Sequence, residues 1–248
     1  MNHKSFSSIR VTWLLLLLSV IPPLLFPLPA SAAPNAPTDT PTPIVTDNVE
    51  EWAVGAGLLY WASNCYADEF NPFAELKRKP IGGGVQRTLE SINDYNLCIT
   101  YQNLLSAADG LYYFDDAQDR IELMPLGEPY TPQVVKALIS GQFPNVGKAF
   151  VEAGDYLYWV HSLSPNAVYR VKKDGSSEVE TVANTGALPA DVMIVGNTVY
   201  WTDSSGVWSI RNDCAALPCS DSQSQFASFG ANTSGYGLLY QYIGGVQG

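Results

Sequence analysis

From Val49 onwards, short runs of β-branched and aromatic residues alternate with segments rich in Gly, Asn, Asp and Ser. Runs of this kind, bounded by turn-forming residues, are typical of β-strands. An apolar period of 3.6 residues, the mark of an amphipathic helix, occurs weakly in one window only, Thr131–Ser140. The pattern therefore predicts an all-β chain.

One hydrophobic motif recurs along the chain: a turn with Gly, an aliphatic residue, then Tyr followed by an aromatic residue. Its copies are GAGLLYWAS from Gly55, ADGLYYFDD from Ala108, AGDYLYWVH from Ala153, VGNTVYWTD from Val195 and a degraded GYGLLYQYI from Gly235. The first tyrosines of the copies are 52, 46, 42 and 40 residues apart. A second aliphatic strand, often with a basic residue, follows in four copies, from Glu75, Arg120, Ala167 and Gly206. This period predicts a β-propeller of four-stranded antiparallel blades, with four complete repeats and a partial fifth.

Each part of the motif has a structural purpose. Large aromatic side chains at alternate positions fill the space between neighbouring blades. Gly and Asn before the strand supply the positive φ of a tight hairpin, and the Asp after it accepts hydrogen bonds from the next turn. We therefore interpret the recurring aromatic residues as buried wedges and not as a ligand platform: Tyr60, Trp61, Tyr112, Tyr113, Tyr158, Trp159, Tyr200, Trp201 and Tyr240.

The order of these motifs resembles the YWTD-type β-propeller repeats of low-density lipoprotein receptor relatives and their exported bacterial counterparts. The full motif stands at Tyr200-Trp201-Thr202-Asp203, whereas Ser63, His161 and Ile243 occupy the place of the Asp in other copies. The resemblance implies six blades, so we expect an incomplete propeller or part of a longer six-bladed one. The alternative is a five-bladed ring closed by an N-terminal strand such as PIVTD.

The N-terminal 48 residues have a different composition. Lys4 and Arg10 precede an apolar run, and Ala30-Ser31-Ala32 is a small-x-small cleavage pattern, so residues 1–32 are predicted to be a signal peptide. The alternative is a retained membrane anchor, which the four prolines between positions 22 and 29 disfavour. Residues 33–48 form a Pro/Thr-rich spacer, and the propeller repeats span 49–248. We expect a secreted, periplasmic or cell-surface protein without a stable membrane span after cleavage.

Export and charge bear on the expected chemistry. The four cysteines, Cys65, Cys98, Cys214 and Cys219, are an even number in an exported chain, which favours disulfides over metal binding. Cys214 and Cys219 enclose a short loop, which leaves Cys65 and Cys98 to pair by exclusion. The net charge is −11, and it becomes −13 when Lys4 and Arg10 are removed with the leader. An acidic surface repels phosphate backbones, so nucleic acid is not an expected partner.

No compact catalytic set is evident, and no catalytic residue is predicted. His161, the single histidine beyond the leader, takes the position that Asp203 holds in its own repeat, which favours a turn residue over a catalytic base. Calcium could be held by oxygen ligands such as Asp68-Glu69, or by Asp115-Asp116 with Asp119 and Glu122, but their spacing follows no calcium-loop pattern.

Two further motifs have structural explanations. The glycine run Pro80–Arg87 lacks the Lys-Ser/Thr ending of a phosphate loop and predicts a hairpin turn. Asn232 matches a glycosylation acceptor, which matters only in a eukaryotic secretory route.

These observations favour an exported binding or scaffold module that recognises a protein or carbohydrate ligand at its loops or central channel. Candidate loops are residues 63–73 and 214–222, because binding residues favour loops on a rigid scaffold. One alternative is a calcium-dependent propeller hydrolase of the lactonase or gluconolactonase kind. Another is the N-terminal part of a larger secreted protein.

Overall fold

A computed structural model describes residues 44–45, 49–63, 73–93, 101–144, 150–213, 217 and 223–228. The chain divides into two compact units, Met1–Thr42 and Pro43–Gly248, and all described residues belong to the second. The strands are β1 (Glu51–Gly55), β2 (Leu58–Ser63), β3 (Phe73–Pro80), β4 (Arg87–Asn93), β5 (Tyr101–Ser106), β6 (Gly110–Asp115), β7 (Arg120–Pro125), β8 (Gln133–Ala137), β9 (Val151–Ala153), β10 (Tyr156–His161), β11 (Ala167–Lys172), β12 (Glu180–Asn184), β13 (Asp191–Val195), β14 (Thr198–Asp203), β15 (Gly206–Arg211) and β16 (Ser224–Ser228).

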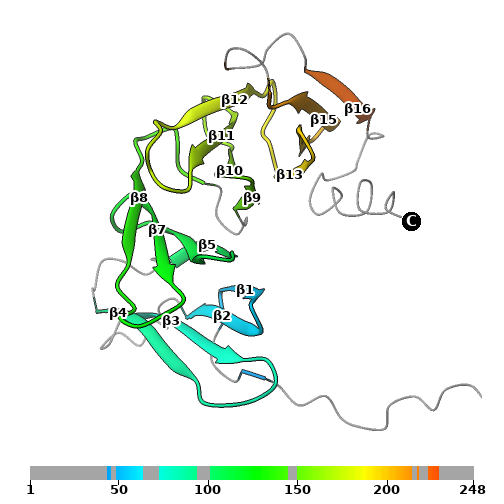
Figure 1. Cartoon of the computed structure of the whole chain (residues 1–248). Coiled ribbons are helices and arrows are strands. Elements are labelled where there is room, and N and C mark those ends of the chain that lie inside the picture. Colours follow the sequence, from blue (N-terminus) through cyan, green and yellow to red (C-terminus); the bar gives the residue numbers. More distant parts are fainter. Residues whose placement is uncertain are drawn as a thin grey trace, which may run out of the picture. The chain divides into compact units, whose positions relative to one another are not determined.

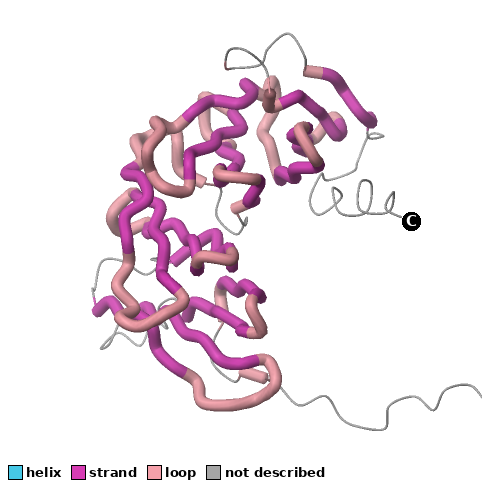
Figure 2. The backbone as a smooth tube through the Cα atoms, in the orientation of Figure 1, coloured by secondary structure: helices cyan, strands magenta, loops and turns pink. Residues whose placement is uncertain are grey.

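The strands form four separate antiparallel sheets of four strands each (Figure 1). The first sheet is β1–β4, the second β5–β8, the third β9–β12 and the fourth β13–β16, and within each sheet every strand pairs with the next one along the chain. Figure 2 shows only strands, loops and turns in the described residues. This arrangement confirms the predicted all-β, propeller-type fold with four complete repeats. Among the described residues, none forms a helix long and apolar enough to cross a membrane.

The two sequence motifs correspond to the second and third strands of each sheet. The aromatic motif forms β2, β6, β10 and β14, and the aliphatic motif forms β3, β7, β11 and β15. Turn glycines with positive φ precede three of the aromatic strands, +74° at Gly57, +58° at Gly154 and +56° at Gly196, as a tight hairpin requires. The glycine run after Pro80 is the turn between β3 and β4, as predicted.

Three hydrophobic cores lie between successive sheets. The first and second sheets share a core that includes Tyr60 and Tyr113, and the second and third share one that includes Tyr112 and Trp159. The third core, between the third and fourth sheets, includes Tyr158 and Trp201. In the second and third sheets, the first aromatic residue of the motif therefore faces the following sheet and the second one faces the preceding sheet, because neighbouring strand residues point to opposite faces.

The weak helical pattern at Thr131–Ser140 forms no helix. Residues Gln133–Ala137 are the strand β8, which pairs with β7. Val134 and Val135 are β-branched and favour a strand, and the neighbouring β7 supplies the hydrogen-bonding partners that an isolated helix would have provided internally. The sheet therefore determines the conformation of a segment whose own preference is weak.

Candidate functional site

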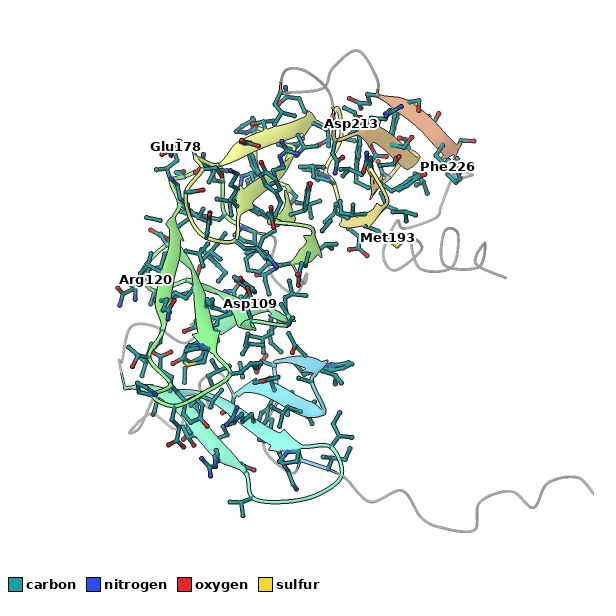
Figure 3. The ribbon with its side chains drawn as sticks, in the orientation of Figure 1. Asp109, Arg120, Glu178, Met193, Asp213 and Phe226 are labelled. Carbon is teal, nitrogen blue, oxygen red and sulfur yellow. The ribbon has the colours of Figure 1, made fainter. Side chains whose placement is uncertain are left out.

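Several predicted site residues lie outside the described part of the chain. These are Cys65, Cys98, Cys214, Cys219, Asp68, Glu69, Asn232 and Tyr240. The disulfide pairing, most of the two candidate binding loops and the partial fifth repeat therefore stay predictions. The described aromatic residues of the recurring motif are buried as predicted, with the exception of Tyr200, which is only partly buried. The Tyr200 ring meets that of Phe226 edge-on at 5.5 Å. Phe226 and Met193, both on the fourth sheet, are labelled in Figure 3.

In the second and fourth sheets, the aspartate that ends the aromatic strand accepts hydrogen bonds from the turn that follows it. Asp203 Oδ1 accepts hydrogen bonds from Ser205 N at 2.7 Å and Gly206 N at 3.2 Å, and Asp115 Oδ1 accepts one from Ala117 N at 3.0 Å. His161 differs, because its Nδ1 lies 2.6 Å from the carbonyl oxygen of Phe143, in the loop that leads to β9. These contacts give all three side chains a structural role.

The predicted carboxylate group is partly assembled at the boundary of the first two sheets. Tyr113 Oη donates to Glu122 Oε2 at 2.7 Å and lies 3.0 Å from Glu90 Oε2, while Arg120 Nη2 lies 2.6 Å from Glu122 Oε1. Burial, followed by the charge of Glu122, raises the pKa of Asp115 to about 6, and burial also raises the pKa of Glu90. Sequence reasoning missed Glu90, because only the packing of β4 against the second sheet brings it close.

The carboxylates of this group contact protein side chains. Within the described residues, no three or more His, Cys, Asp or Glu side chains converge as metal ligands. Glu122 is buried with Tyr113 and Arg120 as its partners, so its oxygens are already engaged. Glu122 thus forms an ion pair with Arg120 and a hydrogen bond with Tyr113. The carboxylates of Asp115 and Glu90 lie close to this pair.

An arginine clamp joins the first sheet to the second and the third sheet to the fourth. The arginine lies directly across from the first tyrosine of the motif, as in the pairs Tyr60–Arg78 and Tyr158–Arg170. Arg78 Nη1 donates to the carbonyl oxygen of Leu126 at 3.0 Å, and Arg170 Nη1 donates to that of Asn212 at 3.2 Å. Both acceptors are the first residue after the third strand of the following sheet.

Each clamp is completed by an aromatic ring beneath the guanidinium group. The Arg78 guanidinium lies 4.5 Å from the centre of the Tyr130 ring and also donates to the Tyr130 hydroxyl. The Arg170 guanidinium lies 4.3 Å from the centre of the Tyr156 ring, and its Nε pairs with Glu180 Oε2 at 2.7 Å. A planar, permanently charged group suits this combination of carbonyl, carboxylate and ring.

The boundary between the second and third sheets lacks the clamp. The first tyrosine here is Tyr112, and the residue across from it on β7 is Leu123 instead of an arginine. The equivalent acceptor position, the first residue after β11, is Lys173. A groove of about 600 Å³ opens at this place. Its lining residues are Asp109, Tyr112, Leu123, Gln133, Val134, Val135, Asp155, Lys172, Lys173 and Asp174.

The groove has a polar, ionic wall. Tyr112 Oη donates to Asp109 Oδ2 at 2.6 Å, and burial with this hydrogen bond raises the pKa of Tyr112. Lys173 Nζ lies 2.6 Å from Glu152 Oε1 and 3.9 Å from Asp109 Oδ2. Asp109, which Figure 3 labels, lies in the turn between β5 and β6 and is about half exposed, so it is reachable from solvent. The groove therefore offers hydrogen-bond acceptors and negative charge beside an aromatic ring.

Sequence reasoning did not find this groove, although the aligned motifs contain a signal for it. The fourth residue of the aliphatic motif is Arg78, Leu123, Arg170 and Ser209 in the four sheets. The alternation of arginine with another residue is visible in the sequence. Its meaning depends on the register that places this position across from the tyrosine, and only the structure gives that register.

Comparison with known proteins supports the fold. No protein-family model matches the chain, and no curated protein matches it. Among solved structures, puromycin hydrolase is similar with a TM-score of 0.50 and 13% sequence identity, over 71% of this chain and 28% of the hydrolase. The computationally designed protein Ika4 is similar with a TM-score of 0.47 and 8% identity, over 67% of this chain and 92% of Ika4. This chain spans less than a third of the hydrolase, and the likeness concerns the fold alone.

Proposed function

We propose that this protein is an exported binding module and that the groove between the second and third sheets is its ligand site. The main support for this proposal is that the boundary between the second and third sheets has Leu123 in place of the clamp arginine. Two boundaries between sheets are closed by an arginine, and the one between them is open and lined by Asp109, Tyr112 and Lys173. A volume of about 600 Å³ falls within the range of ligand pockets.

The environment of the groove favours binding over catalysis. Two of its polar groups are held by neighbouring carboxylates, Lys173 by Glu152 and Tyr112 by Asp109. Such groups fix the orientation of a ligand, whereas a general base or nucleophile needs a group that is poised to react. The export part of the proposal is supported by the leader-like residues 1–32 and by the even number of cysteines.

A matched pair of variants tests the site. Leu123→Arg supplies the missing side chain and fills the groove from within, whereas Leu123→Met keeps its apolar character and approximate volume. The wild-type protein and both variants are labelled and applied to one array of short peptides and glycans. We expect the wild type and Leu123→Met to share ligands that Leu123→Arg fails to bind. An array on which Leu123→Arg matches the wild type contradicts the proposed site.

Calorimetric titration with Ca²⁺ tests the alternative of a metal-dependent hydrolase. A binding module that uses this groove requires no calcium, so we expect no stoichiometric heat at micromolar concentrations of protein and metal. Tight binding with one ion per chain would instead support the calcium-dependent alternative, because oxygen ligands from several loops would then converge on the ion.

A further inference from the structure

We infer that the groove recognises a guanidinium group, and that its ligand is an arginine side chain of a peptide. The inference rests on the proposed function and adds the chemical class of the ligand. Its starting point is that the protein already contains two examples of the complex. Arg78 and Arg170 show how the blade boundary of this protein holds a guanidinium group when one is present.

The two arginine clamps, formed by Arg78 and Arg170, have three contacts in common. The guanidinium lies beside the first tyrosine of the motif, it donates to the carbonyl oxygen after the third strand of the next sheet, and an aromatic ring lies under it. A carboxylate completes the set around Arg170, where Glu180 accepts from Nε. Together these groups satisfy the planar donor fork of an arginine, which lysine lacks.

The groove presents a tyrosine and a carboxylate in the corresponding places, without the guanidinium and without a second aromatic ring among its lining residues. Tyr112 occupies the tyrosine position, and Lys173 occupies the position of the residue whose backbone carbonyl oxygen is the acceptor in the clamps. Asp109 provides a carboxylate within hydrogen-bonding distance of the Tyr112 hydroxyl. Leu123 is shorter than an arginine and lines the groove at the position across from Tyr112. An arginine that enters from solvent would approach the same tyrosine, carbonyl and carboxylate from the opposite direction.

Charge favours a cation over an anion at this place. The carboxylates of Asp109, Asp155 and Asp174 line the groove, against the ammonium groups of Lys172 and Lys173. Lys173 is compensated by Glu152 at 2.6 Å, whereas its distance to Asp109 is 3.9 Å. Asp109 thus keeps acceptor capacity beyond the hydrogen bond from Tyr112, since a carboxylate offers about four lone-pair sites. The net charge of −11 attracts a cationic peptide from a distance.

The test compares peptides that differ in one functional group. The full-length protein is titrated calorimetrically at low salt with acetyl-Gly-Arg-Gly-amide and with the same peptides carrying citrulline or lysine. Citrulline has the shape of arginine without its charge, and lysine has the charge without the planar fork. We expect the citrulline peptide to bind about tenfold more weakly or worse, because hydrogen bonds to a charged group are lost. Lysine should fall between the two.

Two variants locate the binding site. Asp109→Asn should weaken arginine binding by about tenfold and leave the thermal midpoint nearly unchanged, because Asp109 is half exposed. Leu123→Arg should abolish binding and raise the thermal midpoint, since its own guanidinium occupies the site. A cooperative melt of each variant establishes that it is folded. The control is Ser209→Arg, which places an arginine at the equivalent position of the fourth sheet, outside the groove, and should bind like the wild type.

The outcomes separate this inference from the proposed function. Equal binding of the arginine and citrulline peptides, or no binding of either, overturns the guanidinium assignment. In that case a glycan or neutral peptide that is lost in Leu123→Arg still supports a binding groove. Arginine binding that persists unchanged in both Asp109→Asn and Leu123→Arg overturns the location as well.

Discussion

Replacing Asp115 with Asn is predicted to stabilise the protein at neutral pH and to leave it unchanged in acid. Burial and the nearby Glu122 carboxylate raise the pKa of Asp115 to about 6 from a reference value of 3.8. The folded state therefore binds more protons than the unfolded state between these two values. Stability that is present below about pH 4 is lost as the pH rises through 6. The difference of about two units between the folded and unfolded pKa of Asp115 corresponds to about 3 kcal/mol of unfolding free energy.

The contacts of Asp115 indicate how much of this unfolding free energy Asp115→Asn should recover. An Asn side chain keeps an oxygen that can accept the hydrogen bond of 3.0 Å from Ala117 N. It loses the long ion pair of 3.6 Å with Arg120, which remains held by Glu122 at 2.6 Å. The raised pKa already includes the attraction of Arg120, so the shift itself sets the expected gain of about 2–3 kcal/mol at pH 7.5. At pH 3.5, where Asp115 is mainly protonated in both states, the variant and the wild type should have nearly equal stability.

Urea unfolding followed by far-ultraviolet circular dichroism at half-unit steps from pH 3.5 to 8 measures this difference. The control is Asp203→Asn, which makes the same change at the equivalent position of the fourth sheet. Asp203 accepts hydrogen bonds from Ser205 and Gly206 and has no buried carboxylate among these partners, so no gain at neutral pH is expected there. The reasoning is refuted if Asp115→Asn lowers stability at pH 7.5 or shifts it equally at all pH values.

Three further predictions concern the clamps, a close backbone approach and the cysteines. Arg170→Met removes the contacts to Asn212 and Glu180 and should lower the unfolding free energy by about 2–3 kcal/mol in urea melts; a loss under 0.5 kcal/mol would contradict the clamp. Gly175→Ala should cost at least about 2 kcal/mol, because φ is +72° and a Cβ atom would lie 2.3 Å from the Val135 carbonyl oxygen. Gly154→Ala, with positive φ but nothing within 4 Å of the added atom, should cost only about 1 kcal/mol in the same assay. Finally, intact-mass measurement after alkylation without reductant should show no modified cysteine; four alkylated thiols would refute the disulfide prediction.

The sequence predicted the strands and the repeat because both depend on local patterns. Alternation of hydrophobic and polar residues sets the two faces of a strand, and the turn glycines mark its ends, so Tyr158 and Trp159 could be assigned to one strand without knowledge of its neighbours. The segment Gln133–Ala137 shows the limit of this approach. Its helical pattern was weak, and the strand forms because β7 pairs with it.

The groove and the carboxylate group could not be predicted in the same way, because they depend on register and on packing between sheets. Whether Leu123 lies across from Tyr112 or from its neighbour changes which face it occupies, and a shift of one residue reverses the answer. Glu90 meets Tyr113 only because β4 of one sheet packs against the next sheet. The sequence contains these residues, but the distances between them are a property of the folded chain.

A repeat protein places similar side chains at every boundary, so a departure from the repeat is the place where a specific function is expected. Leu123 is such a departure, and it has two measurable consequences. An arginine in its place should stabilise the protein, because it would add a clamp of the kind formed by Arg78 and Arg170. The same arginine should prevent ligand binding, because it fills the groove. A binding site commonly carries such a cost in stability, whereas a mere structural defect would gain stability without any loss of binding. Opposite signs of the two effects in Leu123→Arg would therefore identify the groove as a site.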